Sequence, residues 1–135
     1  MKSVTTYLHF DGNCRTAMAF YQRCLGGDLQ LRAYPDAGGT PSSDPDARIM
    51  HASLTRAGAP TLMASDSSPE GPVHRCNNFS VSIECESLAE IDRLFSAIGE
   101  QGKVRVALAD MPWNARFGML TDRFGIQWIL NCTRA

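Results

Sequence analysis

Residues 13–27 read NCRTAMAFYQRCLGG, and this stretch has the spacing of an amphipathic helix. Its apolar side chains recur three and four positions apart, which places them on one helical face: Ala17, Phe20, Tyr21, Cys24 and Leu25. Asn13 is a residue type favoured at helix N-caps. The paired glycines Gly26 and Gly27 favour the end of a helix. The stretch therefore predicts one helix that buries a single face.

A second helix of the same kind is predicted further along the chain. Ser87 lies 74 positions after Asn13 and is followed by Glu90, which is the spacing of a capping box. Apolar residues then recur at helical spacing: Leu88, Ile91, Leu94, Phe95 and Ile98. Gly99 and Gly102 close the segment. Because internal similarity at a fixed offset indicates repetition, the two helices predict a duplicated unit.

The segments around the two helices also match, since one strand-like segment precedes each helix and three follow it. In the first half the predicted strands are Val4–Phe10, Asp28–Tyr34, Arg48–Thr55 and Pro60–Ser65. In the second half they are Phe79–Cys85, Lys103–Leu108, Ala115–Thr121 and Ile126–Cys132. Each half is therefore predicted as strand, helix and three strands, a βαβββ module.

These elements predict a single α+β domain over residues 1–135. Module one covers about residues 1–66, a linker covers about 67–76, and module two covers about 77–135. The segments Pro35–Asp46 and Ser65–Arg75 are rich in Pro, Gly, Ser and Asp, which is typical of surface loops. A helix covers only one face of a four-stranded sheet. We therefore expect the two modules to pair, so that their other faces form a curved mixed-sheet cleft.

Composition favours a protein without nucleic-acid or membrane partners. The net charge is −1 and no basic run is present, so no field attracts nucleic acid. No apolar stretch approaches the roughly 20 residues that span a bilayer, and we expect a cytoplasmic protein. The cysteine count is odd and no C-x-x-C pair occurs, which favours reduced structural thiols: Cys14, Cys24, Cys76, Cys85 and Cys132.

Three stretches resemble one branch of a known family. They are YLHFDGNCR at residues 7–15, MASD at residues 63–66, and the ending from Trp113 through TDRFG (121–125) to WILN (128–131). Together they are similar to PhnB-like members of the vicinal oxygen chelate (glyoxalase/bleomycin resistance/extradiol dioxygenase) family. The resemblance covers nearly the whole chain. It implies the glyoxalase/bleomycin-resistance fold and a homodimer.

The resemblance also allows the family's metal positions to be compared. Enzymes of the family hold a divalent metal between His, Glu and Gln side chains of four strands. The corresponding positions here are about Thr6, Met63 (or Ser65), Ser80 and Ile129. None is a good ligand, and the turn at residues 122–125 fixes the register of Ile129. We therefore expect no metal and no cofactor.

Relocated metal ligands are the alternative. His9 and His51 lie on predicted strands, and Glu84 and Glu86 lie near the end of another. Two histidines and a carboxylate suit Fe(II) or Zn(II). Strand alternation places His9 on the face opposite to Thr6, which opposes this alternative unless a bulge intervenes.

Without a metal, the expected cleft becomes a pocket for an unknown small molecule. The candidate ligand-binding residues are Trp113, Arg116, Gln127, Ser65, Ser80 and Phe10. Tryptophan offers a stacking surface and arginine a fork of donors for anions. Two alternatives stay open: Trp113 as a loop anchor, and Arg116 in a salt bridge with Asp110 or Asp122.

Several functions remain in competition, and no catalytic residue is assigned. We favour a metal-free small-molecule-binding protein. The alternatives are a metal-dependent lyase, isomerase or dioxygenase with relocated ligands, and a structural module without a pocket. Relatives are also labelled 3-demethylubiquinone 3-methyltransferase. A pocket for S-adenosylmethionine usually needs a Gly-rich turn after the first strand, whereas Gly38-Gly39 lies in a loop.

Overall fold

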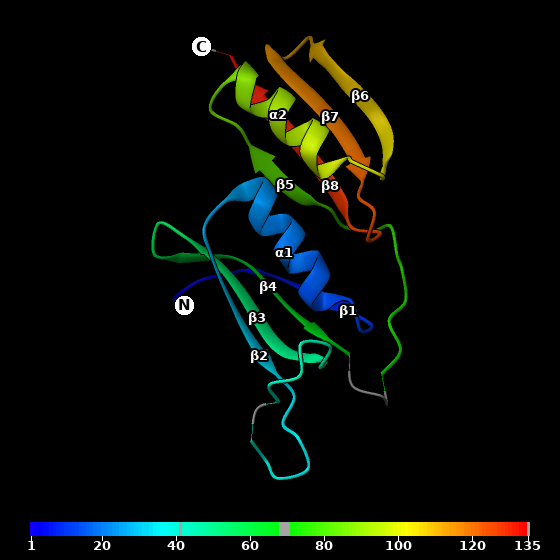
Figure 1. The fold of residues 1–135 in the computed structure, drawn as a ribbon. Coiled ribbons are helices and arrows are strands. Elements are labelled where there is room, and N and C mark those ends of the chain that lie inside the picture. Colours follow the sequence, from blue (N-terminus) through cyan, green and yellow to red (C-terminus); the bar gives the residue numbers. More distant parts are fainter. Residues whose placement is uncertain (41, 68–70, 135) are drawn as a thin grey trace. The chain divides into compact units, whose positions relative to one another are not determined.

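The computed structural model describes residues 1–40, 42–67 and 71–134, which form two compact units. The units are Met1–His74, called module 1, and Arg75–Ala135, called module 2. Each has one helix and a four-stranded mixed sheet (Figure 1), so the predicted α+β fold of two βαβββ modules is confirmed. The boundary lies inside the predicted linker, of which residues 68–70 are outside the described residues, as is residue 41 of the predicted loop.

In module 1 the first and last strands pair with each other in parallel. Its elements are β1 (Thr6–Phe10), α1 (Cys14–Leu25), β2 (Asp28–Ala33), β3 (Ile49–Arg56) and β4 (Ala59–Asp66). The strand order is β1-β4-β3-β2, with β1 parallel to β4 and the other pairs antiparallel.

Module 2 repeats this plan. Its elements are β5 (Val81–Glu84), α2 (Leu88–Ile98), β6 (Lys103–Met111), β7 (Ala115–Thr121) and β8 (Gln127–Thr133). The strand order β5-β8-β7-β6 matches that of module 1, again with one parallel pair at the edge. The elements follow the predicted order, and β6 runs three residues beyond its predicted end at Leu108.

Each helix lies across one face of the sheet in its own module (Figure 1). Leu8, Leu54 and Leu62 lie beneath α1 and are each at most 2% exposed. Leu120, Trp128 and Leu130 lie beneath α2 and are each at most 1% exposed. We call the opposite face of each sheet its distal face. Side chains alternate along a strand, so a residue next to a core residue in the same strand lies on the distal face.

A buried aspartate holds the start of α1. Asp66 is the last residue of β4 and is 2% exposed. Its Oδ1 accepts hydrogen bonds from the backbone N–H of Gly12 (2.8 Å) and Cys14 (3.0 Å), and its Oδ2 accepts one from Ile49 (2.8 Å). Asn13 occupies the predicted N-cap position, but its side chain makes no capping hydrogen bond. The capping acceptor therefore comes from a distant strand.

Module 2 caps its helix locally. The Ser87 hydroxyl accepts the Glu90 N–H at 3.1 Å, as the capping-box spacing predicts. The Glu90 carboxylate reaches back to the N–H of Glu86 at 2.7 Å rather than to that of Ser87. The start of α2 therefore depends on neighbours in sequence, unlike the start of α1.

The turn between β7 and β8 is built around a second buried aspartate. Asp122 Oδ1 accepts the N–H groups of Phe124 (2.8 Å) and Ile126 (3.0 Å), and its Oδ2 accepts the indole N–H of Trp128 (2.9 Å). Gly125 has a positive φ of 88°, which glycine adopts without steric cost. Asp122 therefore shapes this turn, and Trp128, which is 1% exposed, packs in the core.

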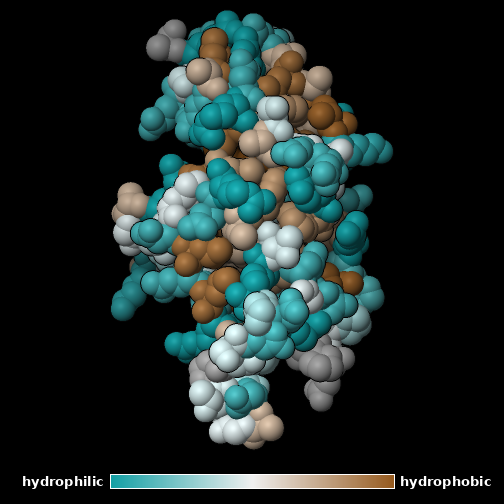
Figure 2. Space-filling model, viewed as in Figure 1, coloured by the Kyte–Doolittle hydropathy of each residue, from teal (hydrophilic) through white to brown (hydrophobic). Residues whose placement is uncertain are grey.

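The surface is mixed in character. On the face shown in Figure 2, hydrophilic residues in teal surround smaller groups of hydrophobic residues in brown. Within the described chain, no helix combines the length and the apolar character needed to cross a membrane.

We predict that Asp66→Ala strongly destabilises module 1. The substitution leaves three N–H groups without their acceptor, and each buried unsatisfied donor costs about 1–3 kcal/mol. The expected loss in the free energy of unfolding is therefore roughly 3 kcal/mol or more, measured by urea denaturation.

The control is Asp46→Ala, which removes an exposed carboxylate from a loop of the same module. Asp66→Asn retains one oxygen acceptor and is expected to lose less stability than Asp66→Ala. Equal stability of the Asp66→Ala and Asp46→Ala variants would show that the carboxylate does not hold α1.

Candidate functional site

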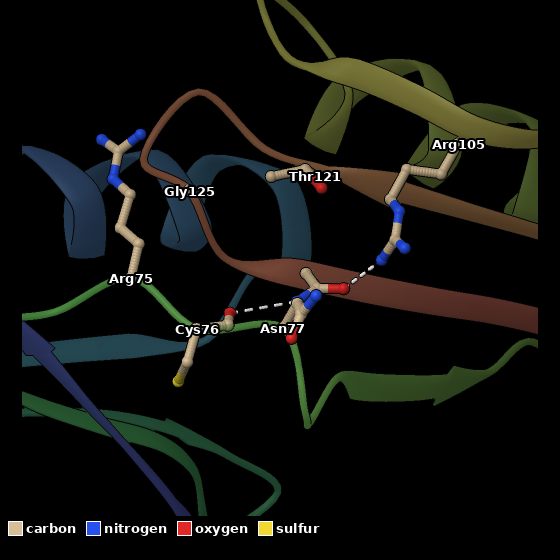
Figure 3. Close-up of a pocket in the computed structure, with 7 residues that line it drawn as sticks. Arg75, Cys76, Asn77, Arg105, Thr121 and Gly125 are labelled. Atoms are coloured by element: carbon tan, nitrogen blue, oxygen red, sulfur yellow. Dashed lines mark hydrogen bonds between the residues drawn. The ribbon is translucent and has the colours of Figure 1, made fainter.

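The distal face of module 2 carries a pocket of about 460 Å³ (Figure 3). Gln127, Thr121 and Gly125 contribute from β8, β7 and the turn between them, and Arg105 contributes from β6. The segment before β5 completes the lining with Arg75, Cys76 and Asn77. The pocket therefore lies entirely within one module.

Gln127 is held in a fixed orientation at the wall of this pocket. Its Oε1 accepts a hydrogen bond from the Arg105 guanidinium, and its Nε2 donates to the backbone carbonyl of Cys76 at 3.2 Å. Both bonds are drawn in Figure 3. The side chain is 7% exposed. The structure thus places this predicted residue in the pocket, and its contact with a ligand stays a prediction.

An apolar strip continues from the pocket along the same face. Ile129 follows Gln127 on the same side of β8 and pairs with Met119, and Phe117 lies two positions from Met119 on β7. The Phe117 ring meets Trp113 edge-on, with ring centroids 5.8 Å apart. Trp113 is 58% exposed, so its ring offers a surface to solvent rather than a buried anchor. The distal face therefore joins a polar pocket to apolar and aromatic side chains.

Arg116 lies on the other side of the sheet, so its predicted place in the pocket is wrong. Its guanidinium contacts Asp92 of α2 at 3.1 Å and Asp110 of β6 at 3.2 Å. The hydrogen bonds to Asp110 and Asp92 raise the pKa of Arg116. The salt-bridge alternative is confirmed for Asp110, because Arg116 alternates with Phe117 and therefore faces the helix.

The other three predicted residues do not line the pocket. Phe10 is 3% exposed and pairs with Asp66 on the α1 side, so placing it on the inner face of the expected cleft was wrong. Ser65 is 9% exposed and lies on the distal face of module 1, while Ser80 is half-buried just before β5. Ligand contacts of Ser65 and Ser80 stay predictions.

The family's metal positions do not present a ligand set here. Thr6 pairs with Leu62 and faces α1, so its expected register was wrong, whereas Met63 lies on the distal face of module 1. Ile129, on the distal face of module 2, has no donor atom. Among the described residues, no group of three or more His, Cys, Asp or Glu side chains could hold a metal ion. The residues present therefore do not fit the family's metal.

The strand histidines gather around a tyrosine instead. Tyr7, His9 and His51 lie on the distal face of module 1, with the Tyr7 hydroxyl 3.0 Å from His51 Nδ1. The Tyr7 ring centroid is 5.2 Å from that of His9 and 5.7 Å from that of His51. His9 thus faces away from α1, not towards it.

One of the two carboxylates considered as relocated ligands, Glu84, is already hydrogen-bonded. Glu84 accepts hydrogen bonds from Asn131 (2.8 Å) and from the N–H and hydroxyl of Thr133 (3.0 and 2.9 Å). These bonds tie β5 to β8 and leave Glu84 a structural role.

Sequence interpretation did not predict six of the residues that line the pocket: Arg75, Cys76, Asn77, Arg105, Thr121 and Gly125. The pairing register shifts between Val104 and Val106, so Arg105 is the extra residue of a bulge in β6. Such a bulge breaks the alternation from which facing is inferred. Arg75 lies in the predicted linker, where no periodicity gives a direction. Neither arginine therefore had a sequence signal.

Comparison with known proteins supports the interpretation of the fold. Residues 2–131 match the profile of a family described as 3-demethylubiquinone-9 3-methyltransferase. Protein YjdN of Escherichia coli K12 is 32% identical over 142 residues, which cover 97% of this chain and 95% of YjdN.

Solved structures give the same result. Protein PA1353 from Pseudomonas aeruginosa is 40% identical with a TM-score of 0.84, and both chains are covered completely. A Bacillus cereus structure described as a putative 3-demethylubiquinone-9 3-methyltransferase, PhnB protein, is 25% identical with a TM-score of 0.76, covering 98% of this chain and 100% of that one. A glyoxalase/bleomycin resistance protein/dioxygenase family enzyme from Burkholderia phytofirmans PsJN is 13% identical with a TM-score of 0.64, covering 96% and 97%.

The last likeness concerns the fold alone, and it shows that the βαβββ modules have a glyoxalase/bleomycin-resistance-like fold. The profile match and the relatives at 32% and 40% identity show the family. The chain belongs to the PhnB-like family, whose profile is described as 3-demethylubiquinone-9 3-methyltransferase.

We predict that a single thiol, Cys76, reacts rapidly in the folded protein. Cys76 is exposed, whereas the other four cysteines are buried. Burial raises the pKa of Cys14 to about 12 and that of Cys85 to about 11, which suppresses their nucleophilic thiolate forms. A thiol-specific chromogenic reagent at pH 8 should count one fast thiol in the native state and five after denaturation.

Cys76→Ser is expected to remove the fast phase. In Figure 3 the Cys76 sulfur points away from Arg105, so the substitution leaves the pocket wall in place. A second fast thiol in the wild-type protein would contradict the buried positions of the other cysteines.

We also predict that Asn131→Ala raises the pKa of Glu84 towards its ordinary value. Hydrogen bonds, the largest from Asn131, hold the pKa of Glu84 below that value in the folded protein. Their stabilising effect is present above the unfolded-state pKa and fades as the pH falls through the folded pKa. Carboxyl-carbon NMR titration measures the change. Asn78→Ala, at an exposed position in the same module, is the control.

Proposed function

We propose that this protein binds a small organic molecule at the distal face of module 2, without a metal ion. The pocket supports this proposal by its size, because ligand sites typically enclose about 300–1,000 Å³. The observation that carries it is the fixed amide of Gln127, which is buried at the pocket wall and oriented by Arg105 and the Cys76 carbonyl. A pre-oriented polar group beside an apolar strip is the usual composition of a ligand site.

The proposal assigns no role to a metal ion, because the side chains at this face are poor metal ligands. Ile129 stands where the family's enzymes carry a ligand, and its hydrocarbon side chain cannot coordinate. Glu84, which pairs with Asn131 and lies on this face, already accepts three hydrogen bonds from Asn131 and Thr133. The polar groups left for a ligand are therefore donors and amides rather than metal-binding carboxylates.

The methyltransferase activity in the family's description is not part of the proposal. The turn from β1 into α1 consists of Asp11, Gly12 and Asn13, and the Gly12 N–H is already bound to Asp66. A cofactor that carries a methyl group usually sits on a Gly-rich turn with free N–H groups after the first strand.

A homodimer, which the resemblance implies, is included in the proposal. Light scattering after gel filtration measures the oligomeric state.

A thermal-shift screen of small organic molecules, run with and without EDTA, tests this function. Binding compounds should raise the melting temperature equally under both conditions, because no metal takes part. Thr121→Val keeps the shape of the side chain but removes a pocket hydroxyl, so it should reduce these shifts. Thr61→Val, at an exposed position on β4 of module 1, should leave them unchanged.

Equilibrium dialysis with the binding compounds, followed by metal analysis of the purified protein, completes the test. Stoichiometric divalent metal together with loss of binding on chelation would overturn the proposal. Ligand shifts that are identical in the wild-type protein and both threonine variants would place the binding site elsewhere.

A further inference from the structure

We propose that the pocket of module 2 selects ligands that carry an oxyanion, and that Arg105 is the group that binds it. This inference rests on the proposed function and adds the chemical class of the ligand. Both arginines of the pocket, Arg75 and Arg105, carry positive charge, and none of the described residues lining the pocket is acidic. A small organic acid or an organophosphate ester offers the complementary charge.

The other arginines with described ion pairs in module 2 provide the contrast. Arg116 contacts Asp92 and Asp110, Arg123 contacts Glu100 at 3.8 Å, and Arg134 contacts Asp110. Over residues 1–40, 42–67 and 71–134, neither Arg75 nor Arg105 forms an ion pair with a carboxylate. Both arginines are exposed to water, so leaving their charges unpaired costs little free energy. The module therefore neutralises arginines elsewhere and leaves the two pocket arginines with uncompensated charge.

Arg105 is the better placed of the two. Its guanidinium donates to Gln127, which also binds the Cys76 carbonyl, so the fork is anchored at one side. A guanidinium has five N–H donors in a fixed plane, and this bond leaves others for a ligand. The Thr121 hydroxyl and the Asn77 amide are further donors on the same pocket. An oxyanion at Arg105 can thus receive several hydrogen bonds.

Arg75 stands on the opposite side of the pocket in Figure 3. A Cβ atom at Gly125 would lie 2.9 Å from Arg75 Nε, so the absence of a side chain there gives the guanidinium its place beside the turn. At this position Arg75 contributes positive electrostatic potential to the pocket and does not bind the same oxyanion together with Arg105. Its contribution should therefore be smaller and more sensitive to salt than that of Arg105.

Three probes of similar size and different charge test the inference: benzoate, phenylphosphate and benzamide. Calorimetric titration should show that at least one of the two anions binds about tenfold more tightly than neutral benzamide, about 1.4 kcal/mol. Comparison of benzoate with phenylphosphate distinguishes a carboxylate from a phosphate ligand. Raising the sodium chloride concentration should weaken the binding of the anions only.

Arg105→Met should weaken the binding of the anion about tenfold, and Arg75→Met should weaken it less. Lys2→Met removes one exposed positive charge from module 1 and is the matched control, with no expected effect. Circular dichroism and the melting temperature establish that each variant is folded.

The inference is overturned if the anions do not bind, if Arg105→Met binds them as the wild-type protein does, or if Lys2→Met gives the same loss. Equal binding of both anions and neutral benzamide, reduced together by Thr121→Val, would also overturn it. That last result would leave the proposed small-molecule function standing, so the two failures can be distinguished.

Discussion

The carboxylate of Asp66 is the contact on which module 1 depends. It joins the end of β4 to the starts of α1 and β3 through N–H groups of Gly12, Cys14 and Ile49. A carboxylate can be buried at low cost only when its oxygens are hydrogen-bonded, so these three segments fix one another. The helix is thereby fixed over one face of the sheet. Which side chains are buried and which stay on the distal face follows from that position.

Asp122 has the corresponding influence on the site in module 2. By binding the indole of Trp128 and two N–H groups of its own turn, it sets where β8 starts and which way its side chains alternate. Trp128 faces α2, so Gln127 and Ile129 must face the opposite way. The orientation of the proposed ligand site is thus a consequence of a structural carboxylate that takes no part in binding. Fold and site are coupled through one turn.

The two faces of the second sheet use the same residue type for different purposes. Arg116 faces the helix, where Asp92 and Asp110 neutralise it. Arg105, in the bulge of a neighbouring strand, reaches Gln127 on the distal face. A family name does not carry this distinction, because function depends on which groups remain available on a shared fold. The family description names a methyl transfer, whereas we propose that the available groups of module 2 bind a ligand.

The sequence by itself determined the features that rest on local chemistry. Helical periodicity, the Ser87–Glu90 cap and the turn at residues 122–125 each involve residues close in the chain, and they predicted the two βαβββ modules. The sequence also offered Gln127 as a candidate ligand-binding residue, and the structure places it in the pocket. These signals are local because backbone geometry links a side chain's direction to its position within a helix or strand.

Tertiary structure alone decided the features that depend on distant partners. The sequence offered Asn13 as the cap of α1, but the acceptor is Asp66, because a buried carboxylate arriving from β4 satisfies several N–H groups at once. It placed Phe10 in the site, although α1 covers that face, since alternation separates two faces without saying which one a helix covers. The pocket itself arises where a bulge redirects Arg105 and where the segment before β5 brings Arg75 beside Gly125. Neither of these two placements produces a periodic pattern in the sequence, so only the folded structure reveals them.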